Sequence, residues 1–233
     1  MAVTDVNVVK SAIFERPDDA NKGTLGSLLC VCGSYGMAGA AVMSAKGALR
    51  TGIGLAKCAL PRSIYPIVAQ TILESVYYPL SENADGRISK VNVPFLVSES
   101  CKSSATLVGC GLGVCDDTLK IVFSLIENST TPLVLDADAL NCVAKQPEIL
   151  LRKKASIIIT PHPGEMSRLT GLATSLVNAE RERVALDFAQ KYGVVTVLKG
   201  AGTVIASPNG KVLVNPTGNS GMATGAAVMC LQE

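Results

Sequence analysis

Short apolar runs of strand length recur along the chain, and segments with helical character separate them. Ser27–Cys32 is apolar almost throughout and ends at Gly33, and the alanine-rich, proline-free stretch Met37–Arg50 follows as a predicted helix. Strands that alternate with helices pair in parallel, with helices covering both faces of the sheet. The alternation therefore predicts an α/β fold, a three-layer α/β/α sandwich with a mostly parallel central sheet.

The same alternation continues to residue 215. Further strands are predicted over Leu55–Leu60, Ala105–Gly109, Pro132–Asp136, Ser156–Thr160 and Val194–Leu198. Helices are predicted over Arg62–Ala69, Asp117–Glu127 and Ala137–Lys145, from about Glu165, and from an N-cap at Asn178 to Tyr192. Thr203–Ala206 and Val212–Asn215 flank the turn signal Asn209-Gly210, so an antiparallel hairpin is expected near the C-terminal edge.

The composition indicates one domain with a large aliphatic core. Hydrophobic residues make up 48% of the 233 residues, and aromatic residues only 4%, so Val, Ile, Leu and Ala must fill the core, as is typical of parallel sheets. A net charge of +2 without a long basic run argues against nucleic acid and anionic membranes as partners. No linker or fixed-period repeat divides the chain, and the more polar residues 1–24 are expected to wrap the outside.

The cysteines indicate a reducing, cytoplasmic location. Eight of them are scattered without a CxxC motif, and we interpret them as reduced and mostly buried thiols. Cys30 and Cys32 could share one strand face, but a metal site would need more ligands nearby, and His162 is the only histidine. No apolar stretch reaches the ~18–20 residues that span a bilayer, and the first residues lack a signal-peptide core.

Glycine-rich motifs follow the predicted strands, where ligands of open α/β sheets bind. Gly33–Ala40 and Gly109–Gly113 would let the backbone approach a ligand or an anion closely, although each is also typical of a tight turn. Gly33–Ala40 has neither GxGxxG spacing nor the lysine-serine pair of a P-loop. The stretch Lys199–Thr203 could wrap a nucleotide, or it could simply join two strands.

Two further motifs carry titratable side chains. Asp136 and Asp138 follow a strand and could bind magnesium or a substrate hydroxyl, whereas capping of the next helix by one of them is the alternative. His162 lies between two prolines that fix its path, so its imidazole could orient a ligand or move a proton, although an isolated loop histidine is usually solvated. Glu165 is expected to favour the positive end of the next helix.

Taken in chain order, the motifs are NKGTLG, GSYGMAGAAVMSAKGALRTGIGL, GCGLG, LDADALN, TPHPGEMSRLTG, LKGAGTVIASPNG and NPTGNSGMATG. Together they closely resemble the ATP/ADP-dependent NAD(P)H-hydrate dehydratases of the ribokinase-like superfamily, from about Asn21 to Gly225. The resemblance implies a single ribokinase-like domain over residues 1–233, without a fused epimerase domain. It also implies a homo-oligomer with a functional link to an NAD(P)H-hydrate epimerase. Asn21 and Cys110 stand where the family commonly has histidine and proline.

The implied reaction restores NAD(P)H from the S-epimer of its hydrate. With Mg²⁺, the terminal phosphoryl group of ADP or ATP passes to the ring hydroxyl, and phosphate then leaves. On the substrate side, the resemblance implies Ala40, Gly111, Asp138 and His162. On the nucleotide side, it implies Lys199, Gly200, Ala201, Gly202, Thr203, Asn215, Asn219 and Gly225; it assigns no metal ligand.

The family's proton acceptor is missing from its expected place. In the family, an aspartate in a Gly-Gly-(Thr/Ser)-Gly-Asp run follows Met-Ala-Thr and accepts the proton of the attacking hydroxyl. Here Gly225 is followed by AAVMCLQE, residues 226–233. Deleting one base from plausible codons for Gly-Ser-Gly-Asp-Val-Leu-Thr-Gly-Ile produces these same residues and then the letters TA, which begin two stop codons.

We therefore expect residues 226–233 to be a non-native, frameshifted tail, with the C-terminal helices missing and apolar sheet surface uncovered. The family's catalytic aspartate is then absent, and little activity is expected. Two alternatives remain: an inactive nucleotide-binding remnant, and a related small-molecule kinase for a vitamin precursor. TPHPGEMSRLTG and NPTGNSGMATG argue against the kinase.

Overall fold

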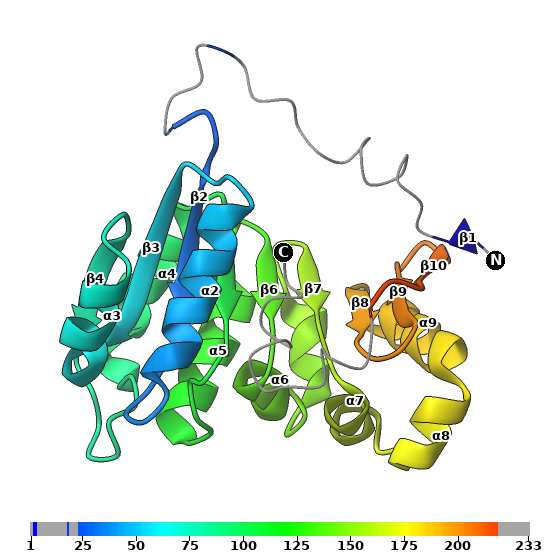
Figure 1. Cartoon of the computed structure of the whole chain (residues 1–233). Helices are drawn as coiled ribbons and strands as arrows, with labels where there is room; N and C mark the ends of the chain where they lie inside the picture. The colour runs from blue at the N-terminus through cyan, green and yellow to red at the C-terminus, as the bar shows by residue number, and fades with distance from the viewer. Residues whose placement is uncertain (1, 4–17, 19–22, 219–233) are drawn as a thin grey trace.

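The computed structural model describes residues 2–3, 18 and 23–218. One ten-stranded sheet runs through them in the order β1-β10-β9-β8-β7-β6-β5-β2-β3-β4 (Figure 1). The strands are β1 (Ala2–Val3), β2 (Ser27–Val31), β3 (Leu55–Pro61), β4 (Val76–Leu80), β5 (Ala105–Val108), β6 (Leu133–Leu135), β7 (Ile157–Ile159), β8 (Val195–Leu198), β9 (Thr203–Ala206) and β10 (Val212–Asn215). The predicted α/β fold is confirmed.

Helices connect most of these strands. The α-helices are α2 (Ala38–Arg50), α3 (Tyr65–Thr71), α4 (Val93–Cys101), α5 (Asp116–Asn128), α6 (Asp138–Val143), α7 (Pro163–Thr170), α8 (Thr174–Ala179) and α9 (Arg181–Tyr192). Three short 3-10 helices join them: η1 (Arg62–Ile64), η2 (Lys90–Asn92) and η3 (Pro147–Arg152).

Strands β2 to β8 pair in parallel, so their carboxyl ends meet at one edge of the sheet. β9 is antiparallel to both β8 and β10, which confirms the predicted hairpin. Its turn closes through the Ser207 N–H, which donates to the Lys211 carbonyl at 2.9 Å, and Gly210 has a positive φ of 93°. A turn of this kind needs a residue that tolerates positive φ.

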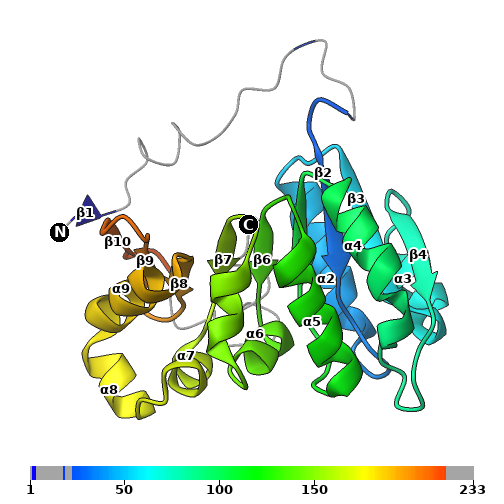
Figure 2. The ribbon, with the colours of Figure 1, turned by 180° about the vertical axis from the view of Figure 1, so that it is seen from behind.

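The helices form two layers around the sheet. α2 and α3 lie on one face, and α4, α5, α6, α7 and α9 lie on the other, as Figures 1 and 2 show from opposite sides. Each layer has its own core: the smaller one lies under α2 and α3, and the larger one under α4 to α9. Cys30 and Cys32 both belong to the smaller core, as expected for residues that share a strand face.

The two faces of strands β6 to β9 differ in burial. Residues that point to the larger core are buried without exception, for example Leu133, Ile157 and Leu198. Their neighbours on the α2 side, Val134, Ile158, Val195, Val197 and Ile205, are all only half-buried. No helix among the described residues covers these strands beyond α2 on that side (Figure 1). Val134 packs against the smaller core, and the other four side chains have no described helix over them.

Some predicted elements differ from the structure. Asn178 does not cap a long helix: it lies inside α8, and α9 begins separately at Arg181 after Glu180. The sequence pattern gave no prediction for β4 or α4, because Pro79 interrupts the first and the second is only 9 residues long. The predicted helix Arg62–Ala69 is a 3-10 turn followed by α3.

The described cysteines agree with the expected reduced state. All seven are free thiols, and five are buried. Cys101 is exposed and Cys115 is half-buried, so these two are exceptions to the predicted burial. Among the described residues, no helix combines the length and the apolar character needed to span a membrane.

Candidate active site at the carboxyl ends of the strands

The strand order brings loops that are distant in sequence together at one edge of the sheet. β2 lies beside β5, so the loop after β2 packs on the loop after β5. The Ser34 hydroxyl donates to the Gly111 carbonyl at 2.8 Å, and the Gly33 N–H donates to the Cys110 carbonyl, also at 2.8 Å. The two glycine motifs therefore form one continuous surface.

Ala40 and Gly111 lie in direct contact at this surface. Gly111 has φ of 64°, and a Cβ atom there would lie 2.7 Å from the Ala40 Cβ. Both the backbone conformation and the close approach of α2 therefore require glycine at this position. Two of the predicted substrate residues thus lie together, although they are distant in sequence.

Gly109, at the end of β5, also lies where a side chain would not fit. A Cβ atom at Gly109 would lie 2.0 Å from the Asp136 carbonyl oxygen. Glycine therefore permits the end of β5 to pack against the end of β6. This contact places Asp136 and Asp138 next to the glycine loop.

Asp138 connects the glycine loop to two helices. Its Oδ2 accepts a hydrogen bond from the Gly113 N–H at 2.8 Å, and its Oδ1 accepts one from Asn141 Nδ2 at 3.3 Å. The Asn141 side-chain oxygen in turn accepts from Arg168 Nε at 2.9 Å. Neither aspartate makes a capping hydrogen bond to α6, whose N-cap is Ala137. The capping alternative is therefore wrong.

Asp136 is the most heavily engaged side chain at this edge, and it is 2% exposed. Its Oδ1 accepts hydrogen bonds from Lys199 Nζ at 2.6 Å and from the Thr160 hydroxyl at 2.7 Å. Its Oδ2 lies 3.6 Å from the Cys110 thiol. One carboxylate thus joins the carboxyl ends of β5, β6, β7 and β8.

His162 is held as the N-cap of α7. Its Nδ1 accepts hydrogen bonds from the backbone N–H groups of Gly164 and Glu165, at 3.0 and 3.3 Å. Glu165 completes a capping box, because its Oε2 accepts from the His162 N–H at 2.8 Å. An Nδ1 that accepts two hydrogen bonds carries no proton, so in the neutral imidazole the proton is on Nε2.

Burial dominates the electrostatics of Glu165. Desolvation raises the pKa of its carboxyl above the ordinary value of 4.5. The His162 N–H and the positive charge of Lys199 oppose this shift, while the charge of Asp136 adds to it. Glu165 is therefore a poorly solvated carboxyl beside the Lys199–Asp136 pair.

The residues Lys199–Thr203 form a loop that other parts of the chain hold in place. The Lys199 N–H donates to the Pro161 carbonyl at 2.8 Å, which fixes this loop to the histidine loop. The Thr203 hydroxyl donates to the Gly200 carbonyl at 3.0 Å and closes the turn. Asn215 lies opposite Thr203 in the β9–β10 ladder, so this predicted nucleotide residue joins the same cluster.

Arg181 supports the same loop from the start of α9. Its guanidinium donates to the carbonyls of Leu198 and Lys199, at 2.8 and 3.2 Å. A Cβ atom at Gly200 would lie 3.0 Å from that guanidinium. Burial lowers the pKa of Arg181. The sequence analysis did not single out Arg181, because this residue lies at the start of α9 and outside every recognised motif.

A hollow of about 370 Å³ lies between this loop and α9. Its lining includes Arg181, Ala201, Gly202, Val204 and Val214. The hollow thus opens directly beside two of the predicted nucleotide residues. Two more residues were predicted on the nucleotide side, Asn219 and Gly225. Both lie outside the described residues, and so does the tail 226–233.

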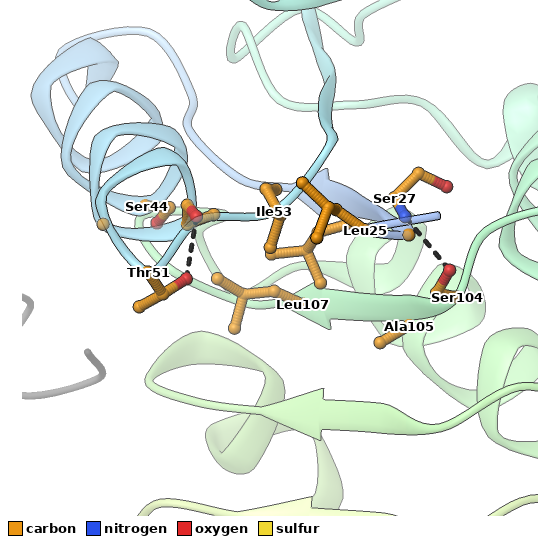
Figure 3. Close-up of a pocket in the computed structure, with 12 residues that line it drawn as sticks. Leu25, Ser27, Ser44, Thr51, Ile53, Ser104, Ala105 and Leu107 are labelled. Atoms are coloured by element: carbon orange, nitrogen blue, oxygen red, sulfur yellow. Dashed lines mark hydrogen bonds between the residues drawn. The ribbon is translucent and has the colours of Figure 1, made fainter. Parts of the chain in front are cut away.

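A second cavity lies at the opposite end of the sheet and contains no predicted site residue. It has a volume of about 200 Å³ beside α2 and the first residues of β2 and β5, with Leu25, Ile53 and Leu107 in its wall (Figure 3). The Thr51 hydroxyl donates to the Ala48 carbonyl, and the Ser104 hydroxyl accepts from the Ser27 N–H. Because these polar groups are already paired, the cavity lacks the convergent polar groups of a ligand site.

The comparison with family models gives one match that covers most of the chain. The model described as NAD(P)H-hydrate dehydratase matches residues 28–227. A bifunctional NAD(P)H-hydrate repair enzyme of Thermofilum pendens is 40% identical over 90% of this chain and 40% of its own length. The chain spans about two fifths of the length of the bifunctional relatives that it matches.

Shorter relatives and solved structures agree with this match. An ADP-dependent (S)-NAD(P)H-hydrate dehydratase of Neisseria meningitidis is 33% identical over 90% of this chain and 67% of its own length. The ADP/ATP-dependent NAD(P)H-hydrate dehydratase of Bacillus subtilis, co-crystallized with ATP/Mg²⁺, is 29% identical, with a TM-score of 0.82 over 99% of this chain and 78% of that one.

A further solved structure confirms the fold prediction. A ribokinase-like superfamily protein of Enterococcus faecalis has a TM-score of 0.81 over 99% of this chain and 76% of that one. At 21% identity, this likeness concerns the fold alone.

Proposed function

The chain belongs to the NAD(P)H-hydrate dehydratase family, and on that premise we propose that its site serves the ADP- or ATP-dependent dehydration of the S-epimer of hydrated NAD(P)H. The product would be NAD(P)H, so the function is repair of nicotinamide nucleotides. Phosphoryl transfer to the ring hydroxyl would convert a poor leaving group into phosphate, which then departs as the double bond returns.

One observation carries this proposal: the loops that the family resemblance assigns to substrate and nucleotide meet at one edge of the sheet. The Ala40–Gly111 contact and Asp138 lie on one side, and Lys199 with its loop lies on the other. The His162 loop joins the two sides through the Pro161 carbonyl. Phosphoryl transfer depends mainly on positioning of this kind and on stabilised charge.

The nucleotide would bind along residues 199–203, with its phosphates toward Lys199. A lysine ammonium is a point charge suited to phosphate, and glycines allow close approach of backbone N–H groups. The hollow of about 370 Å³ beside Ala201 and Gly202 offers room for part of the nucleotide. Asn215 lies opposite Thr203 and would complete this side.

Magnesium would enter with the nucleotide. Among the described residues, no group of three or more histidine, cysteine or carboxylate side chains is arranged to hold a metal ion. The oxygens of Asp136 and Asp138 already accept hydrogen bonds from protein donors. Mg²⁺ commonly keeps several waters and binds through substrate phosphates, which fits a site of this kind.

On the substrate side, the small residues Ala40 and Gly111 leave backbone exposed for close approach. The cap uses Nδ1 of His162, while Nε2 lies 3.4 Å from Glu165 Oε1, and the side chain is 47% exposed. It could therefore orient a substrate oxygen without losing its cap. Asp138 would act through the Gly113 N–H, by fixing the glycine loop.

We expect little turnover from the chain with this sequence, because the residues after Gly225 supply no proton acceptor in the expected place. A reading frame restored after codon 225 should increase turnover strongly. Sequencing of the coding DNA past that codon would show whether a run encoding Gly-Asp-Val-Leu lies in the neighbouring frame. An intact frame without such a run would contradict the frameshift hypothesis.

Two measurements test the proposed function separately. Calorimetry with ADP, ATP and Mg²⁺ measures nucleotide binding, and the recovery of NADH absorbance from its hydrate measures turnover. We expect binding by the 233-residue chain and turnover chiefly by the frame-restored version. Phosphorylation of a vitamin precursor by the restored protein, without action on NADH hydrate, would instead support the kinase alternative.

Location and partners follow as part of the same proposal. The free thiols of the described cysteines fit a reducing compartment, so we place the protein in the cytoplasm. Because some relatives are bifunctional repair enzymes, a functional link to an NAD(P)H-hydrate epimerase is expected. A homo-oligomer is expected for the intact family member, and one sheet through all described strands supports a single domain over residues 1–233.

A further inference from the structure

Asp136 is a buried carboxylate that joins four neighbouring strand ends. Three donors surround it, and each comes from a different strand end: Cys110 after β5, Thr160 after β7 and Lys199 after β8. The side chain of Asp136 is 3% exposed, so water contributes little to its solvation. The carboxylate depends on these protein donors, and its orientation is determined by them.

Lys199 is the partner that carries the opposite charge. Its side chain is 12% exposed, and Asp136 Oδ1 is the acceptor that the described residues give its ammonium. An ammonium has three N–H donors, so this contact leaves others for an anionic ligand. The lysine main chain is also fixed, because its N–H donates to the Pro161 carbonyl.

The contact with Asp136 determines where the flexible Lys199 side chain places its ammonium. A lysine side chain has a flexible four-carbon stem, and an ammonium without a counter-charge would turn toward water. A carboxylate at 2.6 Å holds the ammonium at one place. Asp136 itself has both oxygens engaged, which makes it unsuitable as a ligand for substrate or metal.

We infer that Asp136 is a positioning residue for nucleotide binding, which acts by holding Lys199 toward the phosphates. This inference rests on the proposed function, because the anion expected at Lys199 is a nucleotide phosphate. Asp136 is not among the residues that the family resemblance assigns to substrate or nucleotide. Its effect on binding should therefore pass entirely through Lys199.

A double-mutant cycle on nucleotide affinity tests this directly. Asp136→Asn should weaken the Kd for ADP at least about tenfold, because a charge-assisted hydrogen bond is lost. In a Lys199→Met background, the same substitution should change the Kd by less than about twofold, since no ammonium remains to be positioned. Calorimetry with ADP and Mg²⁺ on the 233-residue chain gives all four values.

Glu99 supplies the matched control. It is also a buried carboxylate with lysine partners, at 2.9 Å from Lys102 Nζ and 3.7 Å from Lys57 Nζ, but it lies on α4, away from the site loops. Glu99→Gln should reduce stability without changing the Kd for ADP. A comparable loss of ADP affinity in Glu99→Gln would show that the effect of Asp136→Asn is general destabilisation, and would overturn the inference.

Thr160 keeps the inference testable if Asp136→Asn does not fold. Thr160→Val removes one hydrogen bond to Asp136 Oδ1 and retains the side-chain shape, whereas Thr160→Ser retains the hydroxyl. We expect the valine variant to bind ADP several-fold more weakly than the serine variant. Equal affinities in this pair, or an unchanged Kd in Asp136→Asn, would overturn the inference. Absence of ADP and ATP binding by the unsubstituted chain would contradict the proposed function itself.

Discussion

At the scale of single residues, His162 has two roles that one substitution series can separate. Its ring caps α7 through Nδ1, and its Nε2, which lies 3.4 Å from Glu165 Oε1, is the atom proposed to contact substrate. The first role depends on an acceptor at the N-cap, and asparagine supplies one as well as any residue. The second role requires the imidazole.

We predict that His162→Ala lowers the free energy of unfolding by about 0.5–2 kcal/mol, because the cap of α7 is lost. His162→Asn should retain most of that stability while losing affinity for hydrated NADH. Urea unfolding and substrate titration of the frame-restored protein measure the two effects. Equal stability of the alanine and asparagine variants would show that the ring does not act as a cap.

Glu165 should give the protein a stability that falls as pH rises. Burial raises the pKa of this carboxyl above 4.5 in the folded state, so above about pH 4.5 the folded state retains a proton that the unfolded state has released. Stability is therefore lost as pH rises from 4.5 through the folded pKa. Glu165→Gln removes this dependence and retains an oxygen that accepts from the His162 N–H.

The measurement is the free energy of unfolding of both proteins from pH 4 to 8. We expect the stability of Glu165→Gln relative to the unsubstituted chain to increase as pH rises through this window. A relative stability that falls over the same window would mean that the hydrogen bond from His162 and the charge of Lys199 outweigh burial.

At the scale of elements, the packing of α2 on the loop after β5 depends on glycine at position 111. Gly111→Ala should be destabilised twice over, by the left-handed backbone at about 1–2 kcal/mol and by the 2.7 Å contact with Ala40. Gly36 offers a matched control, because its φ is 83° but nothing lies within 4 Å of a Cβ atom there.

We predict that Gly111→Ala loses more stability than Gly36→Ala, and that the difference measures the contact with α2. Ala40→Gly should reduce this difference in a double-mutant cycle, since it removes the facing methyl group. Urea unfolding of the four variants provides the values. Equal losses at Gly36 and Gly111 would show that the loop moves away from α2 at no cost.

At the scale of the whole molecule, the described residues cover the sheet unevenly. In strands β6 to β9, the side chains that point to the larger core are buried. The aliphatic side chains that point to the α2 side are only half-buried. The expectation that missing C-terminal helices uncover this surface stays a prediction, because residues 219–233 lie outside the described residues. Such a face is a risk for association, because apolar area without a partner favours contact with other molecules.

Adjacent residues of β7 test this asymmetry. Ile157 points into the larger core and is 1% exposed, whereas Ile158 points to the open face and is half-buried. Ile157→Ala should lower the free energy of unfolding by about 2–5 kcal/mol. Ile158→Ala should cost clearly less. Equal costs in urea unfolding would mean that the α2 side is covered in solution.

Much of this architecture could be predicted from the sequence. The alternation of short apolar runs with helical segments determined the α/β class, and Asn209-Gly210 determined the antiparallel hairpin, because both are local patterns that neighbouring residues impose on the backbone. The motifs were also correctly placed at the strand ends. Local signals failed where a helix broke: nothing near Asn178 indicated that α8 ends and α9 begins at Glu180.

Only the tertiary structure decided which of these ends meet. The motif gave Asp136 and Asp138 the same candidate roles, and the resemblance assigned only Asp138 to the site. In the structure, Asp136 pairs with Lys199, 63 residues away, while Asp138 holds the glycine loop. Arg181 had no motif at all and supports the loop from α9. Contacts across a parallel sheet follow the spatial order of its strands, which differs from their order in the chain, so no local pattern contains them.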